Sequence, residues 1–320
     1  MTTQKTSDHR HPSPLAALVI VPLVVAIVLT LFAWPSARLE PRDLPVGVAG
    51  PAPAVGQLEQ QLGANPDAFD VHRYANEAEA RSAIEDREVY GAFVATPDGP
   101  KVLSSTAASP AVAQLLGHAA AETGAPTEDV VTAEHGAALP SSVLPLVIAG
   151  ILIGVASSLL TSSAAGRASL LVAGSAIIGL VAAGIVQSWL DVVEGDWIVN
   201  AGVLGLTVLA IGATVTGMYA WLGGVGIGIA AALMVFIGNP FSAAGSAPEM
   251  LPEPVGGIGQ LLPPGAGANL LRSTGFFDGA AAGVPLAVLL VWALGGLALL
   301  ALATARARTP AAAPAQMRVG

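Results

Sequence analysis

The side chains best suited to chemistry lie in the stretch 239–283, between two hydrophobic runs. There Arg272 follows an apolar Leu-Leu pair, and it is the only basic residue between Arg167 and Arg306. A guanidinium in this place can bind an anionic lipid headgroup or an anionic part of a substrate. The alternative is a snorkelling arginine, whose stem lies in the membrane interface while its charge reaches water. Both interpretations place the stretch at a membrane surface.

The same stretch holds the other candidates for contact with lipid or substrate, namely Asn239, Pro263, Pro264 and Gly265. We expect the Pro-Pro-Gly sequence to break any helix, because proline lacks the backbone N–H and its ring clashes with the preceding turn. A hairpin that lies on the membrane or re-enters it fits this composition. Irregular backbone at membrane depth is tolerated only where protein buries it or where it lines a cavity. A re-entrant hairpin would therefore favour a translocation path.

No pattern in the chain predicts an enzyme. A phosphate-binding loop needs a Gly-rich turn that ends in Lys, and neither Lys5 nor Lys101 follows such a turn. The run GVGIGIAA at 224–231 lacks the third glycine of a dinucleotide-binding loop and lies in a hydrophobic segment, so it predicts helix packing. The histidines lack metal-ligand spacing, and no GxSxG elbow occurs. We expect no catalytic residue, no cofactor and no metal.

Two further patterns have a functional and a structural interpretation. Gly150/Gly154 and Gly224/Gly228 are pairs of small residues spaced for close helix packing, although glycine is also simply common in membrane helices. A short acidic loop at 191–196, flanked by tryptophans, could bind a cation. Solvated acids beside an interfacial aromatic belt explain that loop without one.

Composition indicates a membrane protein. The chain is 53% hydrophobic and only 11% charged, whereas about a quarter of the residues of a soluble domain are charged. It has no cysteine, which excludes disulfides and thiolate chemistry. The net charge of −9 argues against a nucleic-acid partner, and the bilayer is the expected one.

Six uncharged or nearly uncharged runs are long enough to cross a hydrocarbon core of about 30 Å. The first, 15–34, exceeds the roughly 7–15 residues of a signal-peptide core and lacks a small-x-small cleavage site, so we expect an uncleaved anchor. The run from Trp197 to Pro248 carries no charge, and we divide it at 216–219 because it is too long for one helix. The predicted spans are 15–34, 143–160, 170–190, 198–215, 220–237 and 285–303.

Between the first two spans, region 35–142 holds most of the charges and predicts a water-soluble α/β domain. Strands are expected at 44–50, 69–74, 93–95 and 101–105, with a hairpin turn at 97–99. Helices are expected at 54–64, 76–90 and 109–124, the last with Ser109 as N-cap. The resulting fold class is an α-helical polytopic membrane protein of six transmembrane helices, with an extracytoplasmic α/β domain between helices 1 and 2.

Orientation follows from the bias of Lys and Arg toward cytoplasmic loops. If tails 1–14 and 305–320 are cytoplasmic, Asp8 is the sole acid on the inner side. The basic residues on that side are Lys5, Arg10, Arg167, Arg306, Arg308 and Arg318. This predicts a five-helix membrane domain at 143–304, with 239–283 as an outer hairpin beside the 35–142 domain.

The order of one anchor, an external domain and five further spans resembles the permease fold of type-2 ABC exporters. It is most similar to the phage-infection-protein group of bacterial membrane proteins, through LPVGVAG, EAEARSAIEDREVYGAFVATPDG and NPFS…EMLPEP…LLPPGAGANLLRS…FFDG. The resemblance implies a subunit in the bacterial cytoplasmic membrane that exports hydrophobic or amphiphilic molecules with a separate ATPase, as a homodimer.

The chain departs from that family at two places. The fourteen residues before Leu15 show no amphipathic period, and the polar turn around Arg167 is short, so neither an elbow helix nor a coupling helix is evident. The alternative function is therefore a non-transporting surface protein whose external domain binds a cell-wall, secretion or phage partner.

Overall fold

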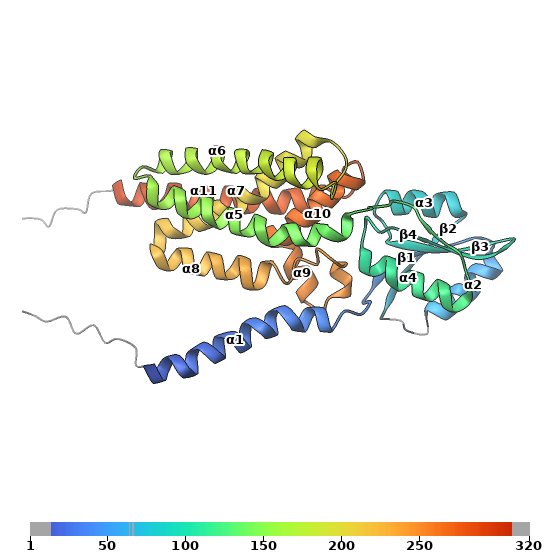
Figure 1. Cartoon of the computed structure of the whole chain (residues 1–320). Helices are drawn as coiled ribbons and strands as arrows, with labels where there is room; N and C mark the ends of the chain where they lie inside the picture. The colour runs from blue at the N-terminus through green and yellow to red at the C-terminus, as the bar shows by residue number, and fades with distance from the viewer. Residues whose placement is uncertain (1–13, 64, 66, 309–320) are drawn as a thin grey trace, which may run out of the picture.

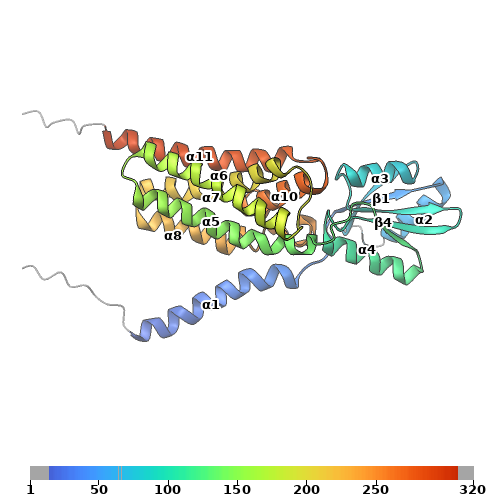
Figure 2. The same ribbon diagram turned by 45° about the horizontal axis from the view of Figure 1, so that its top comes forward.

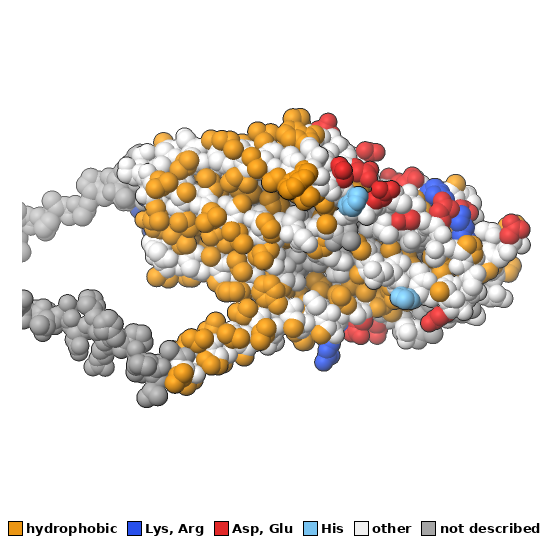
Figure 3. Space-filling view, viewed as in Figure 1, with side chains coloured by type: hydrophobic (Ala, Val, Ile, Leu, Met, Phe, Trp, Pro, Cys, Tyr) orange, Lys and Arg blue, Asp and Glu red, His pale blue; other side chains and the backbone are white. Residues whose placement is uncertain are grey.

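A computed structural model describes residues 14–63, 65 and 67–308. It has two parts, a helical bundle and a small α/β domain at one end of that bundle (Figure 1). The first helix begins, and the last helix ends, at the bundle end away from this domain (Figure 2). Hydrophobic side chains cover the helical part, whereas acidic side chains gather on the α/β domain and at its junction (Figure 3). Of the predicted tails, residues 1–13 and 309–320 lie outside the described residues.

Five helices of the described residues are long and apolar enough to cross a membrane. They are α1 (Pro14–Ala37), α5 (Leu139–Leu160), α6 (Ala164–Ala183) with its π-helical extension η2 (Gly184–Trp189), α7 (Trp197–Leu222) and α11 (Gly283–Arg308). These helices and the small sheet are consistent with a polytopic membrane protein. Their apolar surfaces, exposed here, match a hydrocarbon environment.

The predicted division of the long apolar run at 216–219 is wrong, because α7 continues through those residues to Leu222. The chain turns instead at Gly223, whose positive φ of 60° favours glycine. It then runs back along α7 as α8 (Gly224–Ala232) and the π-helical η3 (Leu233–Gly238). At 1.5 Å per residue this segment spans roughly 22 Å. It is therefore shorter than the thickness of a hydrocarbon core, which is about 30 Å.

Helix α7 is the centre of the bundle, with α5, α6, α8 and α11 packed around it. In the most apolar 18-residue part of α7, 72% of the residues are buried inside the protein. Glycines let the helices approach closely: a Cβ on Gly179 of α6 would lie 2.7 Å from the Cα of Gly205, and one on Gly296 of α11 would lie 2.4 Å from the carbonyl oxygen of Ala213. Small residues at such contacts are typical of helix packing in membranes. By contrast, only 6% of the corresponding part of α1 is buried.

The turn predicted around Arg167 is shorter in the structure. Only residues 161–163 separate α5 from α6, and Ser163 caps α6 by accepting a hydrogen bond from the amide of Gly166. Arg167 therefore lies in the first turns of α6. Its guanidinium stacks on the ring of Tyr219 at 5.3 Å.

In the described part of the α/β domain, one mixed sheet has the strand order β2-β1-β3-β4-β5. Its strands are β1 (Leu44–Ala49), β2 (Phe69–Tyr74), β3 (Gly91–Thr96), β4 (Gly99–Ser104) and β5 (Thr127–Asp129). Its helices are α2 (Ala52–Leu62), α3 (Glu77–Glu85) and α4 (Pro110–Thr123), and a 3₁₀ turn, η1 (Gly136–Ala138), leads into α5.

The predicted hairpin is confirmed, because β3 and β4 pair antiparallel. The predicted cap is also confirmed, since Ser109 accepts from the amide of Val112. The short strand β5, which pairs parallel with β4, was not predicted. The helix predicted at 76–90 is shorter in the structure, because α3 ends at Glu85 and leaves Arg87 at a positive φ of 59°.

Candidate functional site

The stretch 239–283 is built from short helices. They are the 3₁₀ turn η4 (Pro248–Met250), α9 (Val255–Gln260) and α10 (Pro263–Phe276). The expectation that Pro263 and Pro264 break a helix is wrong, because they occupy the first turn of α10. Proline is tolerated there, since the first amides of a helix have no intrahelical partner. The stretch is therefore a folded segment rather than an irregular hairpin.

Part of this stretch completes the core of the α/β domain. Ala247 and Met250 are buried in one apolar cluster with Leu44, Val46 and Leu116. Two backbone hydrogen bonds hold the contact: the amide of Glu40 donates to the carbonyl of Met250 at 3.1 Å, and the amide of Arg42 donates to the carbonyl of Glu249 at 3.0 Å. The α/β domain and the stretch therefore share a core.

Arg87 links the α/β domain to α10. Its guanidinium donates to the side-chain oxygen of Asn269 at 2.8 Å and to the hydroxyl of Ser273 at 2.5 Å, and it lies 5.4 Å from the ring centroid of Phe277. The positive φ of Arg87, which follows the end of α3, places it in a tight turn against α10. Hydrogen bonds from a charged donor are among the stronger ones in proteins.

The polar contact continues from Arg87 into the rest of the stretch. The amide nitrogen of Asn269 donates to the side-chain oxygen of Gln260 at 2.9 Å, and Gln260 donates to the backbone oxygen of Ser242 at 3.0 Å. Ser273 in turn donates to the backbone oxygen of Ala280 at 2.5 Å. One side chain of the α/β domain thus contacts a network that joins α9, α10 and the loops on either side.

Tyr90 makes a second polar link. Its hydroxyl donates to a carboxylate oxygen of Glu249 at 3.0 Å. Burial raises the pKa of Tyr90, and the neighbouring Glu249 carboxylate raises it further. Burial also lowers the pKa of Arg87, an effect that the negative charge of Glu249 opposes. Tyr90 therefore stays protonated at neutral pH and can act as the donor.

These residues surround a cavity of about 580 Å³ at the junction of the two parts. Its polar wall includes Arg87, Tyr90, Glu249, Gln260 and Asn269. The rest of the wall includes the apolar residues Leu251, Pro254, Val284 and Pro285, and it also carries the charged residues Arg42, Asp43 and Glu253. The size is typical of a ligand pocket, and the combination of walls suits an amphiphilic molecule.

Of the predicted site residues, Arg272 is placed differently from either interpretation. Its side chain is 6% exposed and donates to the backbone oxygen of Ala244 at 2.7 Å. The snorkelling interpretation is therefore wrong, because the guanidinium is held inside the stretch. It fixes the loop before η4 to α10.

The other predicted site residues are also packed. Pro263, Pro264 and Gly265 are buried in α10, and a Cβ on Gly265 would lie 2.2 Å from the carbonyl oxygen of Gly259. Asn239 is half-buried and ends η3, where its amide donates to the carbonyl of Met234 at 2.9 Å. Neither these four residues nor Arg272 lines the junction cavity.

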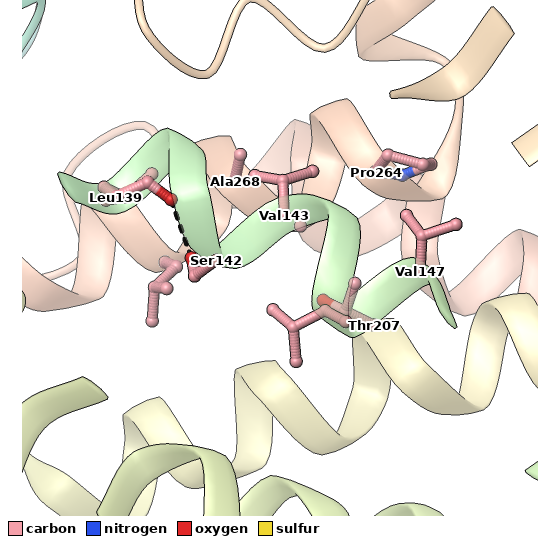
Figure 4. Close-up of a pocket in the computed structure, with 10 residues that line it drawn as sticks. Leu139, Ser142, Val143, Val147, Thr207, Pro264 and Ala268 are labelled. Carbon is pink, nitrogen blue, oxygen red and sulfur yellow. Dashed lines mark hydrogen bonds between the residues drawn. The ribbon is translucent and has the colours of Figure 1, made fainter. Parts of the chain in front are cut away.

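A small cavity of about 10 Å³ lies where α5, α7 and α10 meet (Figure 4). Its two hydroxyl groups are occupied, because Ser142 donates to the carbonyl of Leu139 and Thr207 to that of Val203. A cavity of this size holds one water molecule at most. The contact between α10 and the bundle therefore leaves no room for a ligand larger than water.

On its bundle side, α10 is held by Asn200. Thr274 donates to the side-chain oxygen of Asn200 at 2.7 Å, and Asn200 donates to Gln187 at 2.9 Å and to the backbone oxygen of Glu194 at 2.6 Å. Asp196 of the acidic loop caps α7 by accepting from the amide of Val199. Among the described residues, no group of three or more acids and histidines is arranged to hold a metal.

The two predicted glycine pairs differ in their surroundings. A Cβ on Gly150 or Gly154 would lie 2.7 Å from a side chain of α7, so both glycines face that helix. A Cβ on Gly224 or Gly228 would meet no atom within 4 Å. The second pair therefore makes no close helix contact in this structure.

Sequence reasoning missed Arg87, Tyr90, Gln260 and Asn269. A signal for Asn269 was present, because Asn269 and Ser273 are four residues apart and share a face of α10. Treating Pro263-Pro264 as a helix break concealed that spacing. No local signal marks Arg87, whose partners lie 182 and 186 positions away in the chain.

Comparison with known proteins gives one finding. Residues 14–124, from α1 through α4, match the model of a family described as ABC-2 family transporter protein. The searches of curated proteins and of solved structures found no match. The resemblance to the phage-infection-protein group stays a prediction. Residues 14–124 and the apolar helices that follow them thus support a membrane permease subunit of an ABC transporter.

Proposed function

We propose that this chain is the permease subunit of an ABC exporter that moves hydrophobic or amphiphilic molecules out across the bacterial cytoplasmic membrane. It works with a separate ATPase and forms a homodimer. The observation that carries the proposal is the junction: α10, packed on the central helix α7, is tied to the α/β domain by Arg87 and by the shared core.

In the proposed topology, the chain crosses the membrane six times and both termini are cytoplasmic. The short segment α8–η3 makes the fifth crossing, because it connects α7 to the stretch at the opposite end of the bundle (Figure 1). The end proposed as cytoplasmic carries Arg167 stacked on Tyr219 and Arg306 stacked on Trp221 at 4.6 Å. Aromatic and basic residues at a membrane interface fit that orientation.

The proposed role of the stretch 239–283 is that of an outer gate. Because it shares a core with the α/β domain, the domain and α10 would move together. Asn239, Pro263, Pro264, Gly265 and Arg272 would contact lipid or substrate only when α10 leaves its closed position on α5 and α7. The junction cavity, with its polar and apolar walls, would receive the amphiphile on the outer side.

One observation favours the alternative of a non-transporting surface protein. The connection of α5 to α6 is only residues 161–163, and α7 and α8 are joined at Gly223. In the described residues these connections offer little surface for an ATPase. An external domain that binds a cell-wall, secretion or phage partner would need no such surface.

Copurification tests the proposal. The full-length chain, extracted from its own cells in mild detergent, should bring down an ATPase subunit, and a deletion strain should accumulate amphiphilic dyes. Arg272→Ala should impair dye efflux in a complemented strain, while Arg73→Ala, an exposed arginine of the α/β domain, should restore it. Absence of an ATPase together with unchanged dye accumulation would favour the surface-protein function.

A further inference from the structure

An open apolar groove lies between α5 and α6, near the end of the bundle that carries the α/β domain. Its volume is about 380 Å³, and its walls include Pro145, Leu146 and Ala149 of α5 and Ile178, Val181 and Ala182 of α6. It is separate from the junction cavity, with which it shares no lining residue. Both walls belong to helices that are long and apolar enough to cross a membrane.

Two departures from regular α-helix border the groove. Pro145 lies inside α5 and has no N–H to donate to the carbonyl of Ser141, so that carbonyl lacks its helical partner. At the same level α6 passes into the π-helical η2, which supplies Ile185 and Val186 to the lining. Such π-helical turns are frequent at functional sites. The exposed Ser141, which lines the groove, gives its apolar body a polar end.

The mouth of the groove is acidic. Leu190 and Val192 line it, and between them Asp191 is exposed, with Glu194 and Asp196 following in the same loop. None of the ion pairs among the described residues involves these three carboxylates. The sequence has no basic residue between Arg167 and Arg272 that could compensate them. The groove therefore combines an apolar body with an acidic end that forms no ion pair among the described residues.

We propose that this groove binds one alkyl chain of a membrane amphiphile that carries an ammonium headgroup. The chain lies between α5 and α6, the ammonium lies beside Asp191, and any polar group of the headgroup region lies near Ser141. Charge complementarity selects the cationic headgroup, because an anionic one would be repelled by three carboxylates. This site does not depend on transport, so it can exist whether or not the proposed function holds.

Photolabelling of the purified full-length chain in maltoside micelles tests the proposal. The probe is dodecyltrimethylammonium with a diazirine at the end of its chain, and the comparison probe is the matching dodecyl sulfate. The ammonium probe should label peptides of α5 and α6 at the groove about fivefold more than the sulfate, as expected for partly exposed charges. Asp191→Asn should reduce this preference about threefold, and asparagine tolerates the positive φ of this position. Asp98→Asn, in the β3–β4 turn, should leave it unchanged.

Filling the groove provides the second arm. Ala182→Leu should reduce labelling by the ammonium probe about tenfold through overpacking. Ala173→Leu, the same substitution at an exposed position of α6 outside the groove, should not. Ala149→Leu serves as the second filling variant if Ala182→Leu does not elute as a single peak. Equal labelling by both probes, attachment outside α5 and α6, or full labelling of the filled variants would overturn the proposal.

Discussion

At the scale of single residues, the junction depends on side chains that bring charge or a hydroxyl group from the α/β domain to α10 and η4. Arg87 and Tyr90 are three positions apart, yet one contacts α10 and the other contacts η4. Half-buried polar groups of this kind are costly to leave without partners. Removing either residue should therefore affect the attachment of the domain more than its internal fold.

Arg87→Ala should lower the free energy of unfolding by about 2 kcal/mol, because it removes charged hydrogen bonds to Asn269 and Ser273. The measurement is thermal unfolding in detergent, followed by tryptophan fluorescence. Arg73→Ala is the matched control, since the Arg73 side chain is 73% exposed and its pair with Glu59 lies at the surface. Arg87→Lys should rescue only part of the loss, because lysine lacks the planar fork of arginine. Equal stability of the Arg87→Ala and Arg73→Ala variants would contradict the linking role.

Tyr90 should make the junction sensitive to alkali. Its pKa is raised in the folded state by burial and by the Glu249 carboxylate, while the unfolded chain ionises near about pH 10. The stabilisation is thus complete below about pH 10 and is lost as the pH rises above that value. Melting temperatures measured from pH 8 to pH 11 should fall more steeply for the wild type than for Tyr90→Phe. Parallel curves would show that Tyr90 does not contribute.

At the scale of elements, packing against α7 determines which helix faces must carry small residues. The sequence identified Gly150 and Gly154 from spacing alone, and the structure places both against α7. The same spacing at Gly224 and Gly228 lies on an open face, because four-residue spacing sets which residues share a face but not what that face meets. Element type was predictable from apolar periodicity, whereas packing partners depend on contacts far apart in the chain.

A pair of matched substitutions separates these two faces. Gly150→Val should destabilise the bundle by roughly 1–3 kcal/mol through overpacking against Ile211. Gly228→Val should have little effect, since nothing lies within 4 Å of the added Cβ. Thermal unfolding of both variants in the same detergent provides the comparison. Similar losses for the two variants would contradict the packing described for α5 and α7.

Element boundaries show where sequence reasoning was limited. Four of the five strands and the cap Ser109 were located because hydrophobic runs and caps are local signals, whereas the three-residue β5 was missed. The end of α7 was placed too early, since only Gly223, one of several glycines nearby, adopts the positive φ of the turn. Pro263-Pro264 was interpreted as a helix break, although proline is equally compatible with a first turn. In both cases the residue type indicated a helix boundary or break nearby. It did not indicate which glycine ends the helix, or whether the prolines end a helix or begin one.

At the scale of the whole molecule, composition alone predicted a membrane part and a charged domain. The docking of that domain could not be predicted, because it depends on contacts such as that of Tyr90 with Glu249, 159 positions apart. The result is a molecule whose charged domain and apolar bundle meet at the stretch 239–283. The orientation of this arrangement across the membrane can be measured directly.

The absence of native cysteine makes a topology experiment simple. Asp98→Cys lies in the exposed β3–β4 turn, and Ser162→Cys lies in the exposed connection between α5 and α6. In intact cells a membrane-impermeant maleimide should label the first variant and not the second. Both should be labelled after the cells are permeabilised, which controls for accessibility. Labelling of Ser162→Cys in intact cells would reverse the proposed orientation.

The shared core has a consequence for the order of assembly. Leu44, Val46 and Leu116 are synthesised long before Ala247 and Met250, which occupy the same cluster. N-terminal parts of a chain generally begin to fold during synthesis. Here the core of the α/β domain stays incomplete until the segment from α5 to η3 and the residues Ala247 and Met250 have been synthesised. Ribosome-bound chains that end before residue 239 should hold this domain in an incomplete state. Its completion then reports that the intervening helices have been inserted.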